Sequence, residues 1–83
     1  MSAKITVIGA GSWGTALANL LAENGEEVKI YSRDEAVADS INQQQRNIKY
    51  FPEYELNNDL TASSNLKESL DDVDVVVISV PTQ

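Results

Sequence analysis

The glycine-rich segment at residues 9–14 constrains the fold more than any other stretch of the chain. It reads Gly-Ala-Gly-Ser-Trp-Gly, follows the apolar, β-branched run at residues 4–8 and opens a run of Ala and Leu with helical spacing. At such a strand-to-helix corner, Gly9 allows the tight turn, Gly11 lets a ligand approach the backbone, and Gly14 lets the helix pack closely on the strand. The N–H groups at the helix start then face an anion. The spacing G-x-G-x-x-G in this context predicts a dinucleotide-binding site, and a glycine-rich turn that binds nothing is the alternative.

Composition and charge limit the partners that the chain can have. Its 83 residues allow one domain at most, and 6 basic against 13 acidic residues give a net charge of −7. This charge argues against nucleic acid or an anionic membrane as a partner. It also opposes an anionic cofactor, so phosphate binding must depend on local backbone N–H groups and one or two well-placed cations. The chain has no Cys and no His, which fits a cytoplasmic protein and leads us to expect no metal site. We also expect no secretory signal and no transmembrane segment.

The rest of the chain alternates between strand-like and helix-like segments. The expected strands cover residues 4–8, 28–32, 60–62 and 73–80, and the expected helices cover residues 12–24, 34–45 and about 65–70. Right-handed crossovers and the glycine corner on the first strand predict an α/β fold. It is a partial doubly wound Rossmann fold with a parallel sheet ordered 3-2-1-4. A ligand of such a sheet binds beyond the carboxyl ends of the strands, at the switch between the first and fourth strands.

The apolar pattern also predicts which faces are buried. The first helix is expected to bury one apolar stripe, made of Trp13, Ala16, Leu17, Leu20 and Leu21. Periodicity alone therefore favours packing of Trp13 in the core. The third helix is expected to bury Leu66 and Leu70, and the β-branched run at residues 73–80 is typical of a strand covered on both faces.

The end of the second strand bears on the choice of dinucleotide. In NAD-binding units, an acidic residue about 20 positions beyond the glycines binds the adenosine ribose. Here Ser32 takes that position and Arg33 follows it. A serine does not repel a 2′-phosphate and a guanidinium binds one well, so the pair favours NADP, with NAD as the alternative. Asp34 remains open as a ribose acceptor, and so does Arg33 as a solvated surface residue. Either Asp34 or Ser32 is expected to cap the next helix.

Residues 47–58 show no clear period and carry Tyr50, Phe51 and Tyr54 close together. The segment is longer than a usual connection, which makes it a candidate functional loop. The alternative is that these aromatic side chains cover the edge of the core.

Four short segments of the chain together match one family. They are G-A-G-S-W-G-T-A-L-A at 9–18, Y-S-R at 31–33, N-I-K-Y-F-P at 47–52 and V-P-T-Q at 80–83. In these segments the chain resembles the NAD(P)-dependent glycerol-3-phosphate dehydrogenases of bacteria. The resemblance implies cofactor contacts at Ser12 and Trp13 by the pyrophosphate, at Arg33 by the adenosine 2′-phosphate, and at Tyr50 in an overhanging loop. The chain departs from the family pattern at Glu53, where a glycine is common.

The resemblance also implies a function. Residues 1–83 would form the N-terminal portion of the dinucleotide-binding domain of an oxidoreductase that interconverts dihydroxyacetone phosphate and sn-glycerol 3-phosphate for phospholipid synthesis. The catalytic lysine and the substrate-phosphate ligands would lie downstream, so no catalytic residue is assigned and this stretch alone is expected to be inactive. The resemblance leaves open that the full-length enzyme is a homodimer.

Two other functions remain open. One is another NADP-dependent reductase of the same superfamily. The other is a non-catalytic nucleotide-sensing Rossmann module, against which the Ser32–Arg33 pair argues, because such modules usually place an acid at that strand end.

Overall fold

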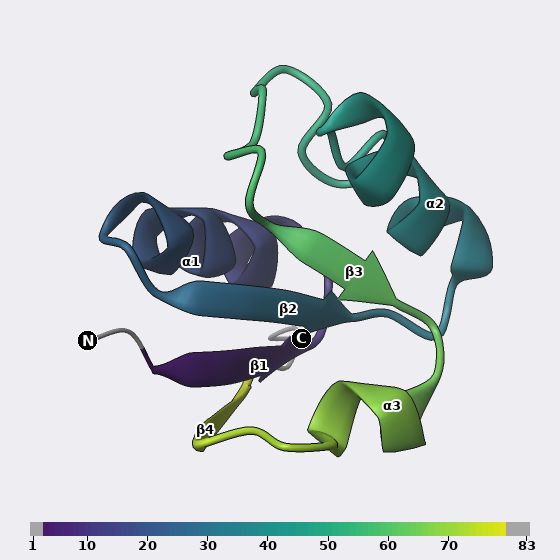
Figure 1. Ribbon diagram of the computed structural model, residues 1–83. Helices are drawn as coiled ribbons and strands as arrows, with labels where there is room; N and C mark the ends of the chain where they lie inside the picture. Colours follow the sequence, from purple (N-terminus) through teal and green to yellow (C-terminus); the bar gives the residue numbers. More distant parts are fainter. Residues whose placement is uncertain (1–2, 80–83) are drawn as a thin grey trace.

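The described residues form a parallel sheet with helices on both faces (Figure 1). The computed structural model describes residues 3–79. The elements in chain order are β1 (Lys4–Ile8), α1 (Ser12–Glu23), β2 (Glu27–Tyr31), α2 (Glu35–Gln44), β3 (Thr61–Ser63), α3 (Leu66–Leu70) and β4 (Val75–Ile78). The strand order is β3-β2-β1-β4 with parallel neighbours, which confirms the predicted fold class and order. Every helix within residues 3–79 is too short or too polar to span a membrane.

The core lies between the sheet and the two helices on its upper face in Figure 1, α1 and α2. Val7 of β1 and Ile30 of β2 are fully buried there. α1 contributes Ala18, and α2 contributes Val37 and Ile41. β-Branched residues in the two central strands suit this position, because their stiff side chains pack well on a pleated surface.

The face that α1 turns to the sheet differs from the predicted one. Its buried residues are the small ones, Gly14, Thr15, Ala18 and Ala22. Trp13 and Leu20 point outward with exposed fractions of 75% and 55%, so the prediction that they pack in the core is wrong. The physical reason is the close approach of helix and strand, which leaves no room for a large side chain at their contact. Ala16 and Leu17 are half-buried, and Leu21 packs against the edge of the core.

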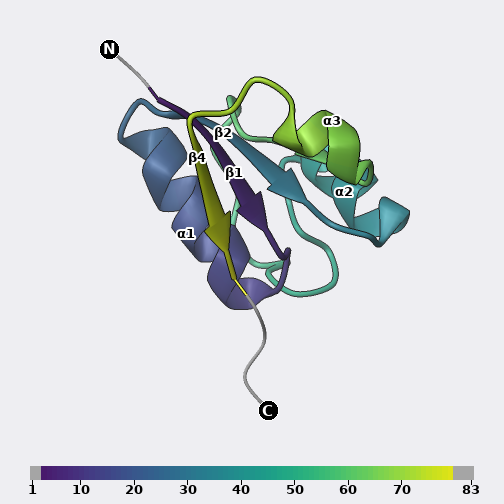
Figure 2. The ribbon, with the colours of Figure 1, turned by 90° about the horizontal axis from the view of Figure 1, so that it is seen from below.

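The predictions that β4 and α3 are well covered are also wrong. Val75, Val76 and Ile78 are exposed, with Ile78 at 70%. Within the described residues, β4 pairs with β1 alone and forms an edge of the sheet (Figure 2). α3 is a five-residue helix that lies against β2 and β3, so it leaves Leu66 and Leu70 exposed and buries Ser69 instead. The predicted strand end at Val80 lies outside the described residues.

Element boundaries within the described residues agree with the expected ones to within one or two positions. β2 and β3 are each displaced by one residue, so Ser32 lies just beyond the end of β2. Asp34 is the N-cap of α2, since its side chain accepts a hydrogen bond from the N–H of Ala36. Asn65 caps α3 in the same way, through the N–H of Glu68.

Candidate functional site

The glycine corner between β1 and α1 is packed too tightly for side chains at two of its three glycines. Gly9 has a φ of +116°, and a Cβ on it would lie 2.0 Å from the carbonyl oxygen of Ser79. A Cβ on Gly14 would lie 2.2 Å from the carbonyl oxygen of Gly9. A Cβ on Gly11 would have nothing within 4 Å. Gly9 and Gly14 are therefore required by the fold, whereas Gly11 borders open space.

The start of α1 offers unpaired donors to that open space. Gly11 is the N-cap, it supplies no side chain to the helix end, and the first helical hydrogen bond runs from the N–H of Thr15 to the Gly11 carbonyl. The N–H groups that precede Thr15 in the first turn of the helix have no acceptor within the helix. No acidic side chain stands in the first turn to occupy them. Together with the helix dipole, these groups favour an anion at this end.

An open cleft of about 1150 Å³ extends from this corner across the carboxyl ends of β1 and β2. All the cofactor-contact residues predicted from the sequence line it: Gly9, Gly11, Ser12, Trp13, Gly14, Arg33 and Tyr50. The remaining lining residues are Ile8, Ala10, Tyr31, Ser32, Asp34, Lys49 and Ser79. The N–H of Ser79, just past β4, donates to the carbonyl of Ile8, so the cleft lies at the switch between β1 and β4 where a ligand was expected.

The loop at residues 47–51 forms one wall of the cleft. Tyr50 is half exposed and lines the cleft, whereas Phe51 packs against the core and stacks on Tyr54 at 4.7 Å between ring centroids. The loop therefore both covers the core edge and borders the site, through different aromatic residues. Glu53, where the family often has glycine, is not among the described residues with positive φ, so this position does not require a glycine.

Asn47 attaches this loop to the glycine corner, although no period or charge pattern marks it in the sequence. Its side chain is fully buried. Its Nδ2 donates to the carbonyl of Ala10 at 2.7 Å and to the hydroxyl of Thr15 at 2.8 Å. Its Oδ1 accepts from the N–H groups of Lys49 at 3.2 Å and Tyr50 at 3.1 Å. One buried amide thus fixes the loop that carries two of the lining residues. Only its place at the head of the N-I-K-Y-F-P segment could have pointed to it.

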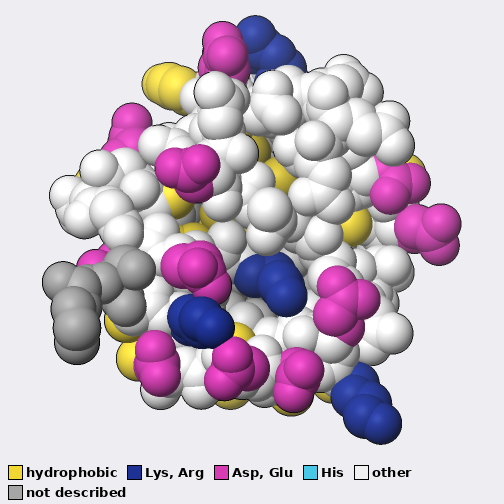
Figure 3. Space-filling model, in the orientation of Figure 1, with side chains coloured by type: hydrophobic (Ala, Val, Ile, Leu, Met, Phe, Trp, Pro, Cys, Tyr) yellow, Lys and Arg dark blue, Asp and Glu magenta, His cyan; other side chains and the backbone are white. Residues whose placement is uncertain are grey.

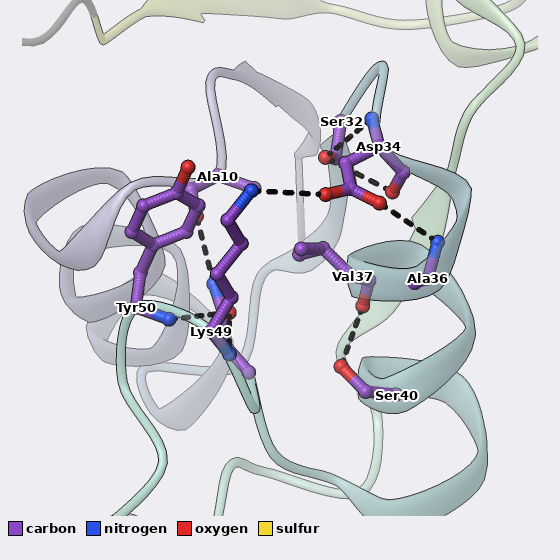
Figure 4. A network of polar contacts seen from close by, with 9 residues as sticks. Ala10, Ser32, Asp34, Ala36, Val37, Ser40, Lys49 and Tyr50 are labelled. Atoms are coloured by element: carbon purple, nitrogen blue, oxygen red, sulfur yellow. Dashed lines mark hydrogen bonds and ion pairs between the residues drawn. The ribbon is translucent and has the colours of Figure 1, made fainter.

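Lys49 and Asp34 join the two sides of the cleft. Figure 4 shows the Lys49 side chain extending from the loop to the Asp34 carboxylate at the head of α2, at 3.3 Å between Nζ and Oδ2. The hydrogen bond from Lys49 holds the pKa of the Asp34 carboxyl below its ordinary value, and the carboxylate in turn raises the pKa of Lys49. The ammonium also lies 5.3 Å from the centre of the Tyr50 ring, within cation–π range. Sequence reasoning had not assigned Lys49 to the site.

The charge of the cleft differs from that of the chain. Acidic side chains are scattered over the face shown in Figure 3, with few basic ones among them. The cleft lining, in contrast, contains Arg33 and Lys49 against the single acid Asp34. Among the described residues, Arg33 forms no ion pair, and its guanidinium remains available to an anion. The site is therefore locally positive in a chain of net charge −7.

A second, smaller cavity of about 390 Å³ lies at the opposite ends of the strands. Its lining mixes lysines with several acids, and Lys4 there is already paired with Asp72 at 2.9 Å. It has neither the glycine corner nor a helix N-terminus, so the larger cleft is the candidate site.

Comparisons with known proteins show to which family the chain belongs. The family model of the N-terminus of NAD-dependent glycerol-3-phosphate dehydrogenase matches residues 4–83. The chain is 50% identical over 80 residues to a glycerol-3-phosphate dehydrogenase [NAD(P)+] of Bacillus anthracis, covering 96% of the chain and 24% of that relative. It is 45% identical over 83 residues to the enzyme of the same name from Lactiplantibacillus plantarum, covering 100% of the chain and 25% of that relative.

Solved structures give the same result. The glycerol-3-phosphate dehydrogenase of Coxiella burnetii superposes with a TM-score of 0.85 at 38% identity, covering 93% of this chain and 24% of that one. The Saccharomyces cerevisiae enzyme gives 0.86 at 32% identity, covering 98% and 27%. The chain thus spans about a quarter of the length of the relatives it matches. Over that length its sequence and overall fold match theirs, and it belongs to the NAD-dependent glycerol-3-phosphate dehydrogenase family.

Proposed function

We propose that the cleft binds NADP(H) for an oxidoreductase that interconverts dihydroxyacetone phosphate and sn-glycerol 3-phosphate. The observation that carries the proposal is the joint position of three features in one cleft. Gly11 borders open space at the free end of α1, Arg33 stands at the end of β2, and Tyr50 faces them from the loop. Each comes from a different segment of the chain, and each suits a different part of a dinucleotide.

The pyrophosphate fits the glycine corner. The backbone at Gly11, Ser12 and Trp13 presents the helix N-terminus to the cleft, and the absence of a Cβ at Gly11 allows close approach of phosphate oxygens. Trp13 and Tyr50, both with exposed aromatic surface at the cleft, would contact the cofactor there.

The residues expected beside the adenosine of the dinucleotide favour NADP over NAD. Arg33 would bind the 2′-phosphate with charge-assisted hydrogen bonds. Asp34, the alternative ribose acceptor, already accepts from the N–H of Ala36 through one oxygen and from Lys49 through the other. The Ser32 hydroxyl accepts from the N–H of Asp34. Neither side chain is arranged as the free carboxylate that NAD-selective units place at this point.

The reaction is proposed from the relatives. Those compared above are named glycerol-3-phosphate dehydrogenase. The bound dinucleotide would supply the hydride for the carbonyl of dihydroxyacetone phosphate. The residues of this chain would bind and orient the cofactor, and the groups that bind the substrate and transfer a proton to it would come from the part of the relatives' length that this chain does not span. The product would feed phospholipid synthesis in the cytoplasm.

Steady-state kinetics of the full-length protein test both the substrate and the role of Arg33. With dihydroxyacetone phosphate present, the wild type should oxidise NADPH with a lower KM than NADH. Arg33→Ala should raise the KM for NADPH by about tenfold or more, because a hydrogen bond to a charged group contributes about 1.5–3 kcal/mol. The KM for NADH should change little.

Two results would contradict the proposal. The first is no oxidation of NADPH with dihydroxyacetone phosphate. The second is an equal effect of Arg33→Ala on both cofactors, which would remove the guanidinium from the 2′-phosphate site. Arg46→Ala is a matched control, because Arg46 hydrogen-bonds the loop carbonyl of Pro52 and does not line the cleft.

A further inference from the structure

The charged side chains of the cleft form one arrangement in which a carboxylate lies next to the expected phosphate site. Among the described residues that line the cleft, the charged ones are Arg33, Asp34 and Lys49. Asp34 follows Arg33 directly in the chain. A bare carboxylate at that position would repel an adenosine 2′-phosphate and would also compete with it for the guanidinium.

Lys49 removes that obstacle. Its ammonium lies 3.3 Å from Oδ2 of Asp34, while Oδ1 of the same carboxylate caps α2 at the N–H of Ala36 (Figure 4). Both carboxylate oxygens are therefore engaged by donors. The hydrogen bond favours the charged form of both groups, since it lowers the pKa of Asp34 and raises the pKa of Lys49.

The backbone of Lys49 is held by a hydrogen bond to a buried side chain, although the Lys49 side chain itself is exposed. Its backbone N–H donates to Oδ1 of the fully buried Asn47, whose Nδ2 binds the carbonyl of Ala10 in the glycine corner. The Tyr50 ring lies beside the ammonium and limits the directions it can take. The same buried amide that holds the cleft wall thus holds the backbone from which the Lys49 side chain reaches Asp34.

We propose that Lys49 is a specificity-determining residue that neutralises Asp34 beside Arg33 and so lets the cleft accept an adenosine 2′-phosphate. The inference rests on the proposed dinucleotide function and adds to it a residue that contacts the acid rather than the phosphate. Because a phosphate monoester carries about 1.5–2 negative charges at pH 7, NADP should respond to the charge of Asp34 far more than NAD does.

The ion pair is expected to contribute little to the stability of the fold. Both side chains are substantially exposed, with fractions of 55% for Lys49 and 39% for Asp34. Exposed ion pairs add little to stability, so loss of this pair should leave thermal unfolding nearly unchanged while it changes the relative affinities for the two cofactors.

Calorimetric titration of the full-length protein with NADP+ and with NAD+ tests the proposal. Lys49→Met should weaken NADP+ binding by roughly threefold to fivefold and NAD+ binding by less than about twofold, as expected for an exposed charge interaction. Lys67→Met is the matched control, since Lys67 carries the same charge on α3, away from the cleft, and should change neither affinity.

A second variant separates neutralisation of Asp34 from direct contact with the phosphate. Asp34→Asn keeps an efficient helix cap and removes the charge, so it should bind NADP+ at least as tightly as the wild type. When Lys49→Met is added to Asp34→Asn, it should have much less effect than in the wild type. An undiminished effect in that double variant, or an equal loss for NADP+ and NAD+ in the single one, would overturn the proposal. Failure of the wild type to bind either dinucleotide would instead refute the proposed function.

Discussion

Replacing Gly9 with alanine is expected to destabilise the fold strongly. The new Cβ would lie 2.0 Å from the Ser79 carbonyl oxygen, at a φ of +116° that L-residues rarely adopt. Backbone strain and overpacking each cost about 1–3 kcal/mol, so Gly9→Ala should lower the free energy of unfolding by on the order of 4 kcal/mol. This is a large part of the roughly 5–15 kcal/mol that typically holds a domain together. Urea unfolding of the full-length wild type and variant measures this change in the free energy of unfolding.

Gly11→Ala is the matched control at the same corner. Its φ is −70° and its Cβ would meet nothing within 4 Å, so the free energy of unfolding should fall by no more than about 1 kcal/mol, the cost of alanine at a helix N-cap. The added methyl group would still occupy space that the pyrophosphate needs, and dinucleotide affinity should fall by about tenfold or more. Equal stability losses for Gly9→Ala and Gly11→Ala would contradict the separation of a structural glycine from a ligand-facing one.

Asn47→Leu is expected to loosen the wall of the cleft. The substitution keeps the number and branching of the side-chain heavy atoms but leaves the N–H groups of Lys49 and Tyr50 without their acceptor and the Ala10 carbonyl without its main donor. Each buried polar group left unpaired costs about 1–3 kcal/mol, so the loss should be about 2–5 kcal/mol. Hydrogen exchange should speed up at the amides of Lys49 and Tyr50. The affinity for the dinucleotide should also fall, because the cleft wall is less well held.

Asn58→Leu provides the comparison, because Asn58 is an exposed asparagine that follows the same loop. It should change neither exchange nor affinity. If the Lys49 and Tyr50 amides exchange as slowly in Asn47→Leu as in the wild type, then Asn47 does not hold the loop.

The topology was predictable because it depends on few features. A glycine corner after the first strand, alternating strand and helix patterns, and right-handed crossovers are enough to order the sheet as β3-β2-β1-β4. The same rules also predicted that the site lies at the carboxyl ends of the strands. The predicted cofactor-contact residues line one cleft because they all lie at carboxyl ends of strands or in the loop beside them.

The buried faces of the helices were less predictable. Hydrophobic periodicity selects large apolar residues, yet α1 approaches the sheet so closely that Gly14 and Ala18 form the contact and Trp13 is left outside. A pattern of apolar residues does not record how near two elements come. In the same way, the β-branched sequence of β4 cannot show that Val76 and Ile78 lie on an edge strand with little covering them.

Two site residues escaped prediction for another reason. Asn47 and Lys49 are common polar residues in an aperiodic loop, and their importance comes from partners far away in sequence, Ala10 and Asp34. Only the folded chain brings these pairs together. Polar networks of this kind lack a sequence period, so neither spacing nor composition reveals them.

A crystal structure of the full-length protein with NADP+ would show where each part of the dinucleotide binds. We expect the pyrophosphate at the N–H groups of the α1 N-terminus beside Gly11, the 2′-phosphate within hydrogen-bond distance of Arg33, and the Lys49–Asp34 contact retained. Binding of the dinucleotide away from the glycine corner, or a 2′-phosphate directed into solvent away from Arg33, would contradict the proposed site.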